Sequence, residues 1–286
     1  MRRRIVWVIV GVPLALIGVA AGAAAAFPTV RHIVSGLLNT PDRLPALAEN
    51  SQVHYQPGAD DYAHAVSALL PAAIARIETA HGRPFAHPVP VGVYATPEAF
   101  ATANGRGATQ PAGVTFFGRV VLSPALYAQQ SQRLPAILTH ELSHAHIQGW
   151  ISANTYIRVP NWFKEGLAVM VSGGGGAEFV SEQEARAAIE RGECIAIDDT
   201  GSLGALVEVR FERAPAQATR SRLILLAYRQ AGMFVAYLRD FDGPGFARMM
   251  SAILDGRPFV EAVAVGYQQD VHTLWQKFAP TCAVQK

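Results

Sequence analysis

Two histidines and a glutamate are spaced for metal chemistry. The segment Thr139-His-Glu-Leu-Ser-His144 contains the pattern H-E-x-x-H. Residues four apart lie on one face of a helix, so His140 and His144 can present two imidazoles to one ion. Glu141 lies about 100° further round that helix, within reach of a water on the same ion. Two neutral nitrogen ligands, a carboxylate that accepts a proton and an open coordination position are what a zinc hydrolase requires.

A second glutamate can complete the ligand set. The stretch Pro160-Asn-Trp-Phe-Lys-Glu-Gly-Leu-Ala168 begins another predicted helix, and its Glu165 follows His144 by 21 residues. A connection of that length allows the second helix to fold back and direct one carboxylate at the metal. The apolar neighbours of Glu165 indicate a largely buried helix, where an unpaired carboxylate is costly. We therefore expect His140, His144 and Glu165 as three protein ligands of Zn2+, with the fourth position left for water.

The two motifs, H-E-L-S-H and P-N-W-F-K-E-G-L-A, resemble those of gluzincin metallopeptidases of the peptidase MA clan. They are most similar to bacterial peptidase MA-like domains with a W-x-x-E-G-x-A signature, over roughly residues 89–278. The resemblance implies zinc bound by His140, His144 and Glu165, and Glu141 as general base. Many gluzincins also carry an acidic residue four positions after the third ligand. This chain has Val169 there, so the support that such an acid gives to a ligand must come from elsewhere or be missing.

This ligand set predicts a hydrolytic mechanism. Zinc would lower the pKa of its bound water toward about 7. Glu141 would take the proton as the water attacks a carbonyl carbon, and would then pass it to the leaving amine. The resulting oxyanion needs a donor besides the zinc. Tyr228 is our candidate for that donor, and simple packing in the core is the alternative interpretation of this tyrosine.

Apolar periodicity around the motifs predicts an α+β fold. Strands are expected at residues 89–94, 112–117 and 119–122, the last two as a hairpin around Gly118. Helical spacing, caps and terminal glycines predict helices at 60–81, 96–103, 135–149, 181–192 and 219–241, a helix that begins at Pro160, and shorter helices as far as Phe278. We therefore expect a small antiparallel or mixed sheet packed on the H-E-x-x-H helix, then a mostly helical C-terminal lobe.

The N-terminus has the pattern of a membrane anchor. Arg2, Arg3 and Arg4 precede 23 uncharged residues from Ile5 to Phe27. A membrane-spanning helix needs about 20 apolar residues, whereas the apolar part of a signal peptide has about 7–15. The length favours an N-terminal transmembrane helix, although its alanine-rich end also contains A-x-A patterns that a signal peptidase could cut. We therefore expect a single-pass protein of the cytoplasmic membrane with an extracytoplasmic domain, or a secreted protein if the segment is cleaved.

These patterns divide the chain into an anchor or signal sequence at residues 1–27, a linker at 28–50 and a catalytic domain at 51–286. The net charge is +2, and three arginines at the N-terminus contribute +3, so we expect no nucleic-acid partner. Cys194 and Cys282 are too far apart in sequence for a cysteine-rich zinc site. They form either a disulfide or two buried thiols.

Three features near the motifs have two interpretations each. The exposed edge of the predicted hairpin could hold an extended peptide by strand addition, or the hairpin could simply belong to the core. The run Gly173–Gly176 is either the hinge of a lid or a plain linker. His81 is expected on a polar face, and His146 in a supporting or structural role, because it points away from His140 and His144.

The sequence thus favours an anchored zinc metallopeptidase that acts on a peptide or protein. One alternative is a zinc-binding module without catalytic activity that recruits a peptide or an envelope protein. The other alternative is an anchored scaffold that binds no metal.

Overall fold

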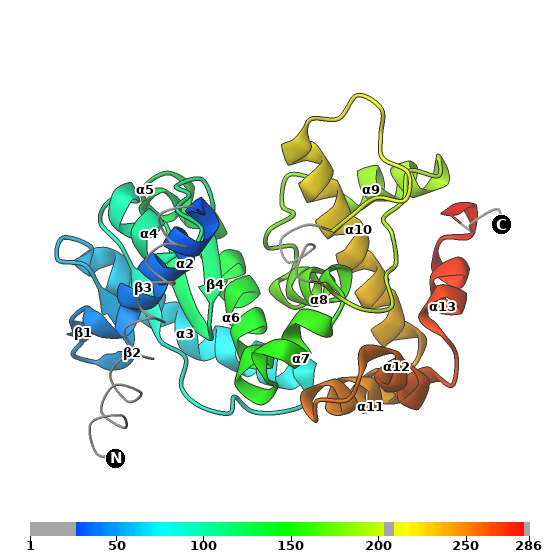
Figure 1. Ribbon diagram of the computed structural model, residues 1–286, viewed down its shortest axis with the longest axis horizontal. Coiled ribbons are helices and arrows are strands. Elements are labelled where there is room, and N and C mark those ends of the chain that lie inside the picture. Colours follow the sequence, from blue (N-terminus) through cyan, green and yellow to red (C-terminus); the bar gives the residue numbers. More distant parts are fainter. Residues whose placement is uncertain (1–26, 203–208, 283–286) are drawn as a thin grey trace, which may run out of the picture.

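The chain folds into a part that contains all the described strands and a part that is helical. The computed structural model describes residues 27–202 and 209–282. Figure 1 shows the segment up to Trp150 on one side of the molecule and the segment from Asn161 onward on the other. The predicted combination of a mixed sheet with a helical C-terminal lobe is present, and the fold class is α+β.

The sheet has the spatial order β1-β2-β3-β5-β4. Its strands are β1 (Ala46–Leu47), β2 (Asn50–Tyr55), β3 (Val91–Val93), β4 (Gly113–Phe116) and β5 (Arg119–Leu122). Strands β2, β3 and β5 run parallel, whereas β1 and β4 are antiparallel to their neighbours. The expected hairpin joins β4 to β5 through Phe117 and Gly118, whose φ angles of 47° and 73° match a turn that follows the strand twist. Strand β4 is therefore an edge strand.

Two long helices pack between this sheet and the helical lobe. Helix α3 (Asp60–His81) is continuous through Pro71 and ends at Gly82, which has a left-handed φ of 71°. Helix α6 (Leu134–Trp150) carries the H-E-x-x-H motif, and every residue from Ile137 to Ile147 is buried. Helix α6 therefore contacts protein on all sides, and the polar side chains of the motif are buried together with its apolar ones.

Short helices connect these elements. Helix α4 (Pro97–Ala103) is capped as predicted, because the Thr96 hydroxyl accepts a hydrogen bond from the Ala99 amide. The stretch predicted as a linker, residues 28–50, contains helix α2 (Pro28–Leu38) and strand β1. Two further helices were not predicted: α5 (Pro124–Gln130) and α7 (Ala153–Arg158).

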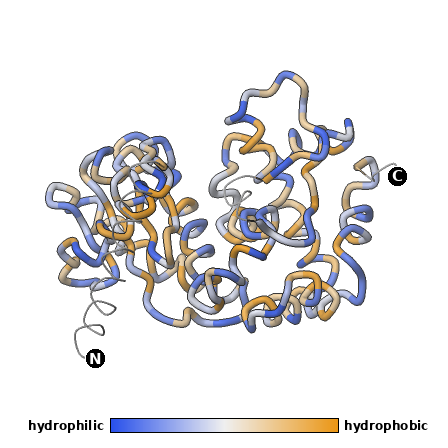
Figure 2. The backbone as a smooth tube through the Cα atoms, in the orientation of Figure 1, coloured by the Kyte–Doolittle hydropathy of each residue, from blue (hydrophilic) through white to orange (hydrophobic). Residues whose placement is uncertain are grey.

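The helical lobe is built around the pair α8 (Asn161–Ser172) and α10 (Arg220–Phe241). Two glycines let these helices approach closely. A Cβ atom on Gly166 would lie 2.5 Å from the Ala231 carbonyl oxygen, and one on Gly232 would lie 2.5 Å from Val169 Cγ1. The lobe is completed by α9 (Glu182–Glu190), α11 (Gly243–Leu254), α12 (Phe259–Tyr267) and α13 (Val271–Phe278). Along these outer helices hydrophobic and hydrophilic residues alternate (Figure 2), so that one side of each faces the core.

The two cysteines form a disulfide. Cys194 and Cys282 are bonded, with their Cα atoms 6.0 Å apart. Cys194 precedes the isolated bridge between Ile195 and Phe211, and Cys282 follows helix α13. The bond therefore ties the chain after α9 to the C-terminal end of the described structure, and the alternative of two free thiols is wrong.

The membrane expectation requires a correction. Within residues 27–202 and 209–282 no helix is both long enough and apolar enough to cross a membrane. The apolar run from Ile5 lies outside the described residues except for Phe27. The transmembrane part of the expected fold, the membrane as a partner and the single-pass location therefore have no support in the structure. These expectations were based on the length of the apolar run, and length alone does not distinguish a transmembrane helix from a signal sequence that is cleaved.

Candidate metal centre

The two motif histidines lie one helical turn apart on α6 and converge on one point. Their Nε2 atoms are 3.2 Å apart, and their rings meet edge to face. Both side chains are more than nine-tenths buried. Because helix α6 is held in the core on all sides, it fixes the direction of both rings. The spacing in the sequence predicted this convergence.

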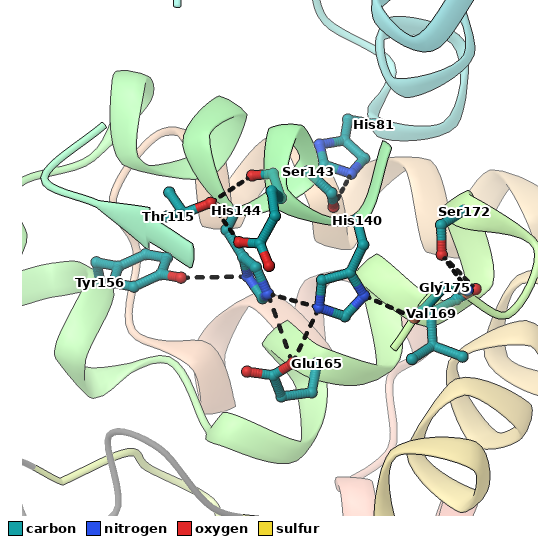
Figure 3. A network of polar contacts seen from close by, with 11 residues as sticks. His81, Thr115, His140, Ser143, His144, Tyr156, Glu165, Val169, Ser172 and Gly175 are labelled. Carbon is teal, nitrogen blue, oxygen red and sulfur yellow. Dashed lines mark hydrogen bonds and ion pairs between the residues drawn. The ribbon is translucent and has the colours of Figure 1, made fainter. Parts of the chain in front are cut away.

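Helix α8 brings Glu165 to the same point (Figure 3). Its Oε2 atom is 3.3 Å from His140 Nε2 and 3.5 Å from His144 Nε2. In a tetrahedral zinc site with metal–ligand distances of about 2.0–2.1 Å, neighbouring ligand atoms are separated by about 3.3 Å. The three observed separations of 3.2, 3.3 and 3.5 Å match that triangle. The donor set, two imidazoles and one carboxylate, is also one that zinc accepts, so the residues fit the ion.

The charges in this cluster favour a cation at its centre. Burial alone would raise the pKa of the Glu165 carboxyl, but His144 and His140 overcome that effect and hold its pKa well below the usual value. Burial alone would lower the pKa of His140, but a hydrogen bond and the charge of Glu165 reverse this and raise its pKa. The buried carboxylate thus stays ionised and stabilises positive charge beside it.

A hydrogen bond from its second nitrogen orients each histidine. His140 Nδ1 lies 2.8 Å from the carbonyl oxygen of Gly175, to which it donates. His144 Nδ1 lies 3.3 Å from the hydroxyl of Tyr156 on α7. A carbonyl oxygen only accepts, so it places the His140 proton on Nδ1 and leaves the Nε2 lone pair for a metal. The Tyr156 hydroxyl can accept the same kind of bond from His144 Nδ1.

Tyr156 is held in place from helix α8. The Lys164 ammonium donates to the Tyr156 carbonyl oxygen at 3.3 Å and lies 4.6 Å from the centre of the phenol ring. Lys164 is only 3% exposed, and burial lowers its pKa to about 8. Lys164, the neighbour of Glu165 in the sequence, therefore supports Tyr156, which in turn contacts His144.

Glu141 is directed by strand β4. The Thr115 hydroxyl lies 2.8 Å from Glu141 Oε2 and 2.7 Å from the Glu141 carbonyl oxygen. A Cβ atom on Gly113 would lie 2.9 Å from Glu141 Cγ, so the small residue at that position makes room for the carboxylate. Glu141 is buried beside the histidines but does not belong to the three-ligand cluster. Its position leaves it available as a base.

Tyr228 on α10 reaches the same centre. Its ring stacks on that of His140, with centroids 6.3 Å apart and planes 14° apart. Burial, and then the negative charge of the nearby Glu165 carboxylate, raise the pKa of Tyr228 well above its ordinary value. The charge of Arg106 acts in the opposite direction on both Tyr228 and Tyr156. Tyr228 is therefore a neutral phenol, able to donate a hydrogen bond at neutral pH.

A buried histidine pair lies on the other side of α6. His81 Nδ1 is 2.9 Å from His146 Nδ1, and His146 Nε2 is 2.9 Å from the Arg83 carbonyl oxygen. His81 Nε2 is 3.2 Å from the Ser143 hydroxyl. In this series of hydrogen bonds from Ser143 to Arg83, every donor meets an acceptor when both imidazole rings are neutral. Burial lowers the pKa of both histidines. His146 is structural, as expected, but His81 is a buried partner and was wrongly placed on a polar face.

Sequence reasoning missed four of the residues around the centre: Thr115, Tyr156, Lys164 and Gly175. Thr115 lies at an inward-facing position of the predicted hairpin, which was a usable signal. Tyr156 lies in a stretch predicted as a connection, and no residue pattern there indicated a contact with His144. Gly175 contributes only a backbone oxygen, which side-chain patterns cannot reveal.

Comparisons with family models, with curated proteins and with solved structures find no match to this chain.

Proposed function

We propose that this protein is a zinc-dependent metallopeptidase. The single observation that carries the proposal is the triangle of two imidazole nitrogens and one carboxylate oxygen, with edges of 3.2–3.5 Å, contributed by two different helices. Zinc bound by His140, His144 and Glu165 would supply a water that ionises near neutral pH and a Lewis acid for a substrate carbonyl.

The chain's own residues account for the proton transfers. Glu141, oriented by Thr115, takes the proton that the attacking water loses and delivers it to the leaving nitrogen. The Tyr228 hydroxyl donates to the oxyanion that develops on the substrate carbonyl. Glu141 is buried and Tyr228 is half-buried, so little water competes for their hydrogen bonds, which strengthens each of these interactions.

Strand β4 supports a peptide as the substrate. It is one of the two edge strands of the sheet, and among the described strands it pairs only with β5. It also carries Thr115, the residue that contacts Glu141. An extended peptide that paired with the outer edge of β4 would run past the catalytic carboxylate.

Metal analysis followed by a cleavage assay tests this proposal. The expected result is one zinc per chain and cleavage of a mixed peptide pool. Glu141→Gln should retain the zinc and lose cleavage by about 10²–10⁴-fold, the usual contribution of a general base. Zinc binding without any cleavage would support the non-catalytic binding module instead. Absence of stoichiometric zinc would contradict both.

A further inference from the structure

The acid that many gluzincins carry four positions after the third ligand is absent here, and its place is filled. Val169 occupies that position, 2.5 Å from where a Cβ on Gly232 would lie. It therefore packs into the close contact between α8 and α10. The hydrogen bond of His140 must be accepted by something else.

A glycine turn after α8 supplies the acceptor. Figure 3 shows Gly175 beside the His140 ring on the side opposite Glu165, with His140 Nδ1 directed at the Gly175 carbonyl oxygen. The turn has no room for side chains against α6. A Cβ on Gly175 would lie 2.5 Å from the Ala136 carbonyl oxygen, and one on Gly176 would lie 3.0 Å from His140 Cε1.

Ser172 holds this turn in shape. Its hydroxyl accepts a hydrogen bond from the Gly175 amide at 2.9 Å and donates to the Val169 carbonyl oxygen at 3.2 Å. The Gly174 amide donates to the same Val169 oxygen at 2.8 Å. Ser172 is buried, so water does not compete for these bonds. The Ser172 hydroxyl thus links the end of α8 to the residue whose carbonyl oxygen meets His140.

The rest of the segment is fixed from α10 and α6. Arg229, the neighbour of Tyr228, donates to the carbonyl oxygens of Val180 and Ala177 at 2.7 and 3.0 Å. Arg133 at the start of α6 binds the carboxylate of Glu178 at 3.0 Å. These contacts hold the residues that follow Gly173–Gly176, and the run itself lies close against α6 at Gly175 and Gly176.

We propose that Ser172 is a positioning residue that orients His140 for the metal through the Gly175 carbonyl, so that a neutral backbone group replaces the carboxylate found in many gluzincins. The inference rests on the proposed zinc site. Its consequence is that the affinity for zinc depends on a hydroxyl that contacts neither the metal nor a ligand.

Zinc affinity, measured by competition with a chelator, tests this role without reference to peptidase activity. Ser172→Ala should weaken zinc binding about 10–100-fold, the usual effect of losing a partner behind a metal ligand. Ser123→Ala is the matched control, because Ser123 is also buried and its hydroxyl also accepts a hydrogen bond from a backbone amide, that of Ala125, but it contacts none of His140, His144 and Glu165. The control should bind zinc like the wild type.

A second measurement applies if Ser172→Ala does not fold. In the zinc-loaded wild-type protein, the His140 Nδ1 proton should be observable by nuclear magnetic resonance and exchange slowly, because it is buried and hydrogen-bonded to Gly175. Fast exchange, or a folded Ser172→Ala variant with wild-type affinity for zinc, would overturn the inference. A wild-type chain that binds no zinc would overturn the proposed function instead, so the two failures are distinguishable.

Discussion

Single side chains define the centre, and the roles of its two glutamates are different. The Glu165 carboxylate lies within 3.5 Å of the Nε2 atoms of both histidines. The Glu141 carboxylate accepts a hydrogen bond from Thr115 and does not belong to that cluster of three side chains. One carboxylate is placed to bind a cation and the other to accept a proton. Their substitutions should therefore affect different measurements.

Replacing Glu165 should primarily reduce metal binding. Glu165→Gln removes the one charged ligand, and we expect zinc affinity to fall by more than about 100-fold, since losing even an outer partner costs about 10–100-fold. Glu190→Gln is the control, because Glu190 is exposed on α9. Chelator competition provides the measurement. Equal zinc affinity of Glu165→Gln and the wild type would remove Glu165 from the ligand set.

Replacing Tyr228 should reduce turnover and leave metal binding intact. Tyr228→Phe keeps the ring that stacks on His140 but removes the hydroxyl, so zinc content should be unchanged while kcat falls by up to about 10²–10³-fold, as for other oxyanion donors. Tyr237→Phe, on the same helix, should have wild-type kcat. If Tyr228→Phe turns over substrate at the wild-type rate, the tyrosine is only a packing residue.

Among the secondary-structure elements, α6 and α8 must keep a fixed separation for their side chains to meet at the centre. Helix α8 is held at that separation by its close contact with α10 at Gly166. This glycine follows Glu165 directly, and a Cβ there would lie 2.5 Å from the Ala231 carbonyl oxygen and 2.8 Å from Val235 Cγ2. The backbone of α10 cannot yield as a flexible side chain would. Helix α8, which carries Glu165, can therefore pack this closely on α10 only because residue 166 has no side chain.

Gly166→Ala should consequently impair both stability and metal binding. We expect the free energy of unfolding to fall by about 1–3 kcal/mol, the usual cost of overpacking a core, and zinc affinity to fall with it. Gly149→Ala is the matched control, because Gly149 is also helical but has no atom nearer than 3.6 Å to the added Cβ. That substitution should be neutral or stabilising by up to about 1 kcal/mol. Denaturant titration compares the variants. Equal stabilities for Gly166→Ala and the wild type would show that the close packing of α8 on α10 does not depend on Gly166.

The elements that position the site were predictable where local chemistry is strong. Thr96 as a cap, the glycine after His81, the capping box at Ser181 and the glycine in the hairpin each fixed a boundary close to the observed one. The short helices α5 and α7 give no period to recognise, and α4, which is as short as α5, was found only from its Thr96 cap and Pro97. The caps Ser123 and Ser152 were equivalent signals that were overlooked. The contact between Tyr156 and His144 was hidden for the same reason, since it depends on α7.

Sheet order and the long-range supports also could not be obtained from sequence. Nothing in the run of valines at residues 89–94 specifies that β3 lies between β2 and β5, because that order is decided by packing on α3 and α6. The ligands were predictable because two of them are four residues apart and the third lies in a specific motif. The role of Gly175 was not predictable, because its carbonyl oxygen meets His140 only where the end of α8 packs against α6.

At the scale of the whole molecule, the buried pair of His81 and His146 joins α3 to α6 and makes stability depend on pH. Burial, then His146 and His144, hold the pKa of His81 well below its ordinary value. Above about pH 6.5 this histidine is neutral in the folded and the unfolded chain alike. Below that pH the unfolded chain takes up a proton that the folded chain does not bind, so the free energy of unfolding falls.

The pH dependence can be measured on the metal-free protein. Between about pH 6.5 and 5 the stability should decrease, and His81→Leu should be less stable but show a shallower decrease, because its share of the proton uptake is gone. His87→Asn, at an exposed histidine, should keep the wild-type slope. An NMR titration in which His81 ionises near its ordinary pKa would contradict this account.

X-ray absorption at the zinc edge would show whether His140, His144 and Glu165 surround one zinc ion. We expect four nitrogen or oxygen ligands at about 2.0–2.1 Å, with the outer scattering of two imidazoles. The outer scattering should diminish to one imidazole in His144→Ala. A zinc–sulfur distance of about 2.3 Å, or a spectrum without imidazole scattering, would contradict it.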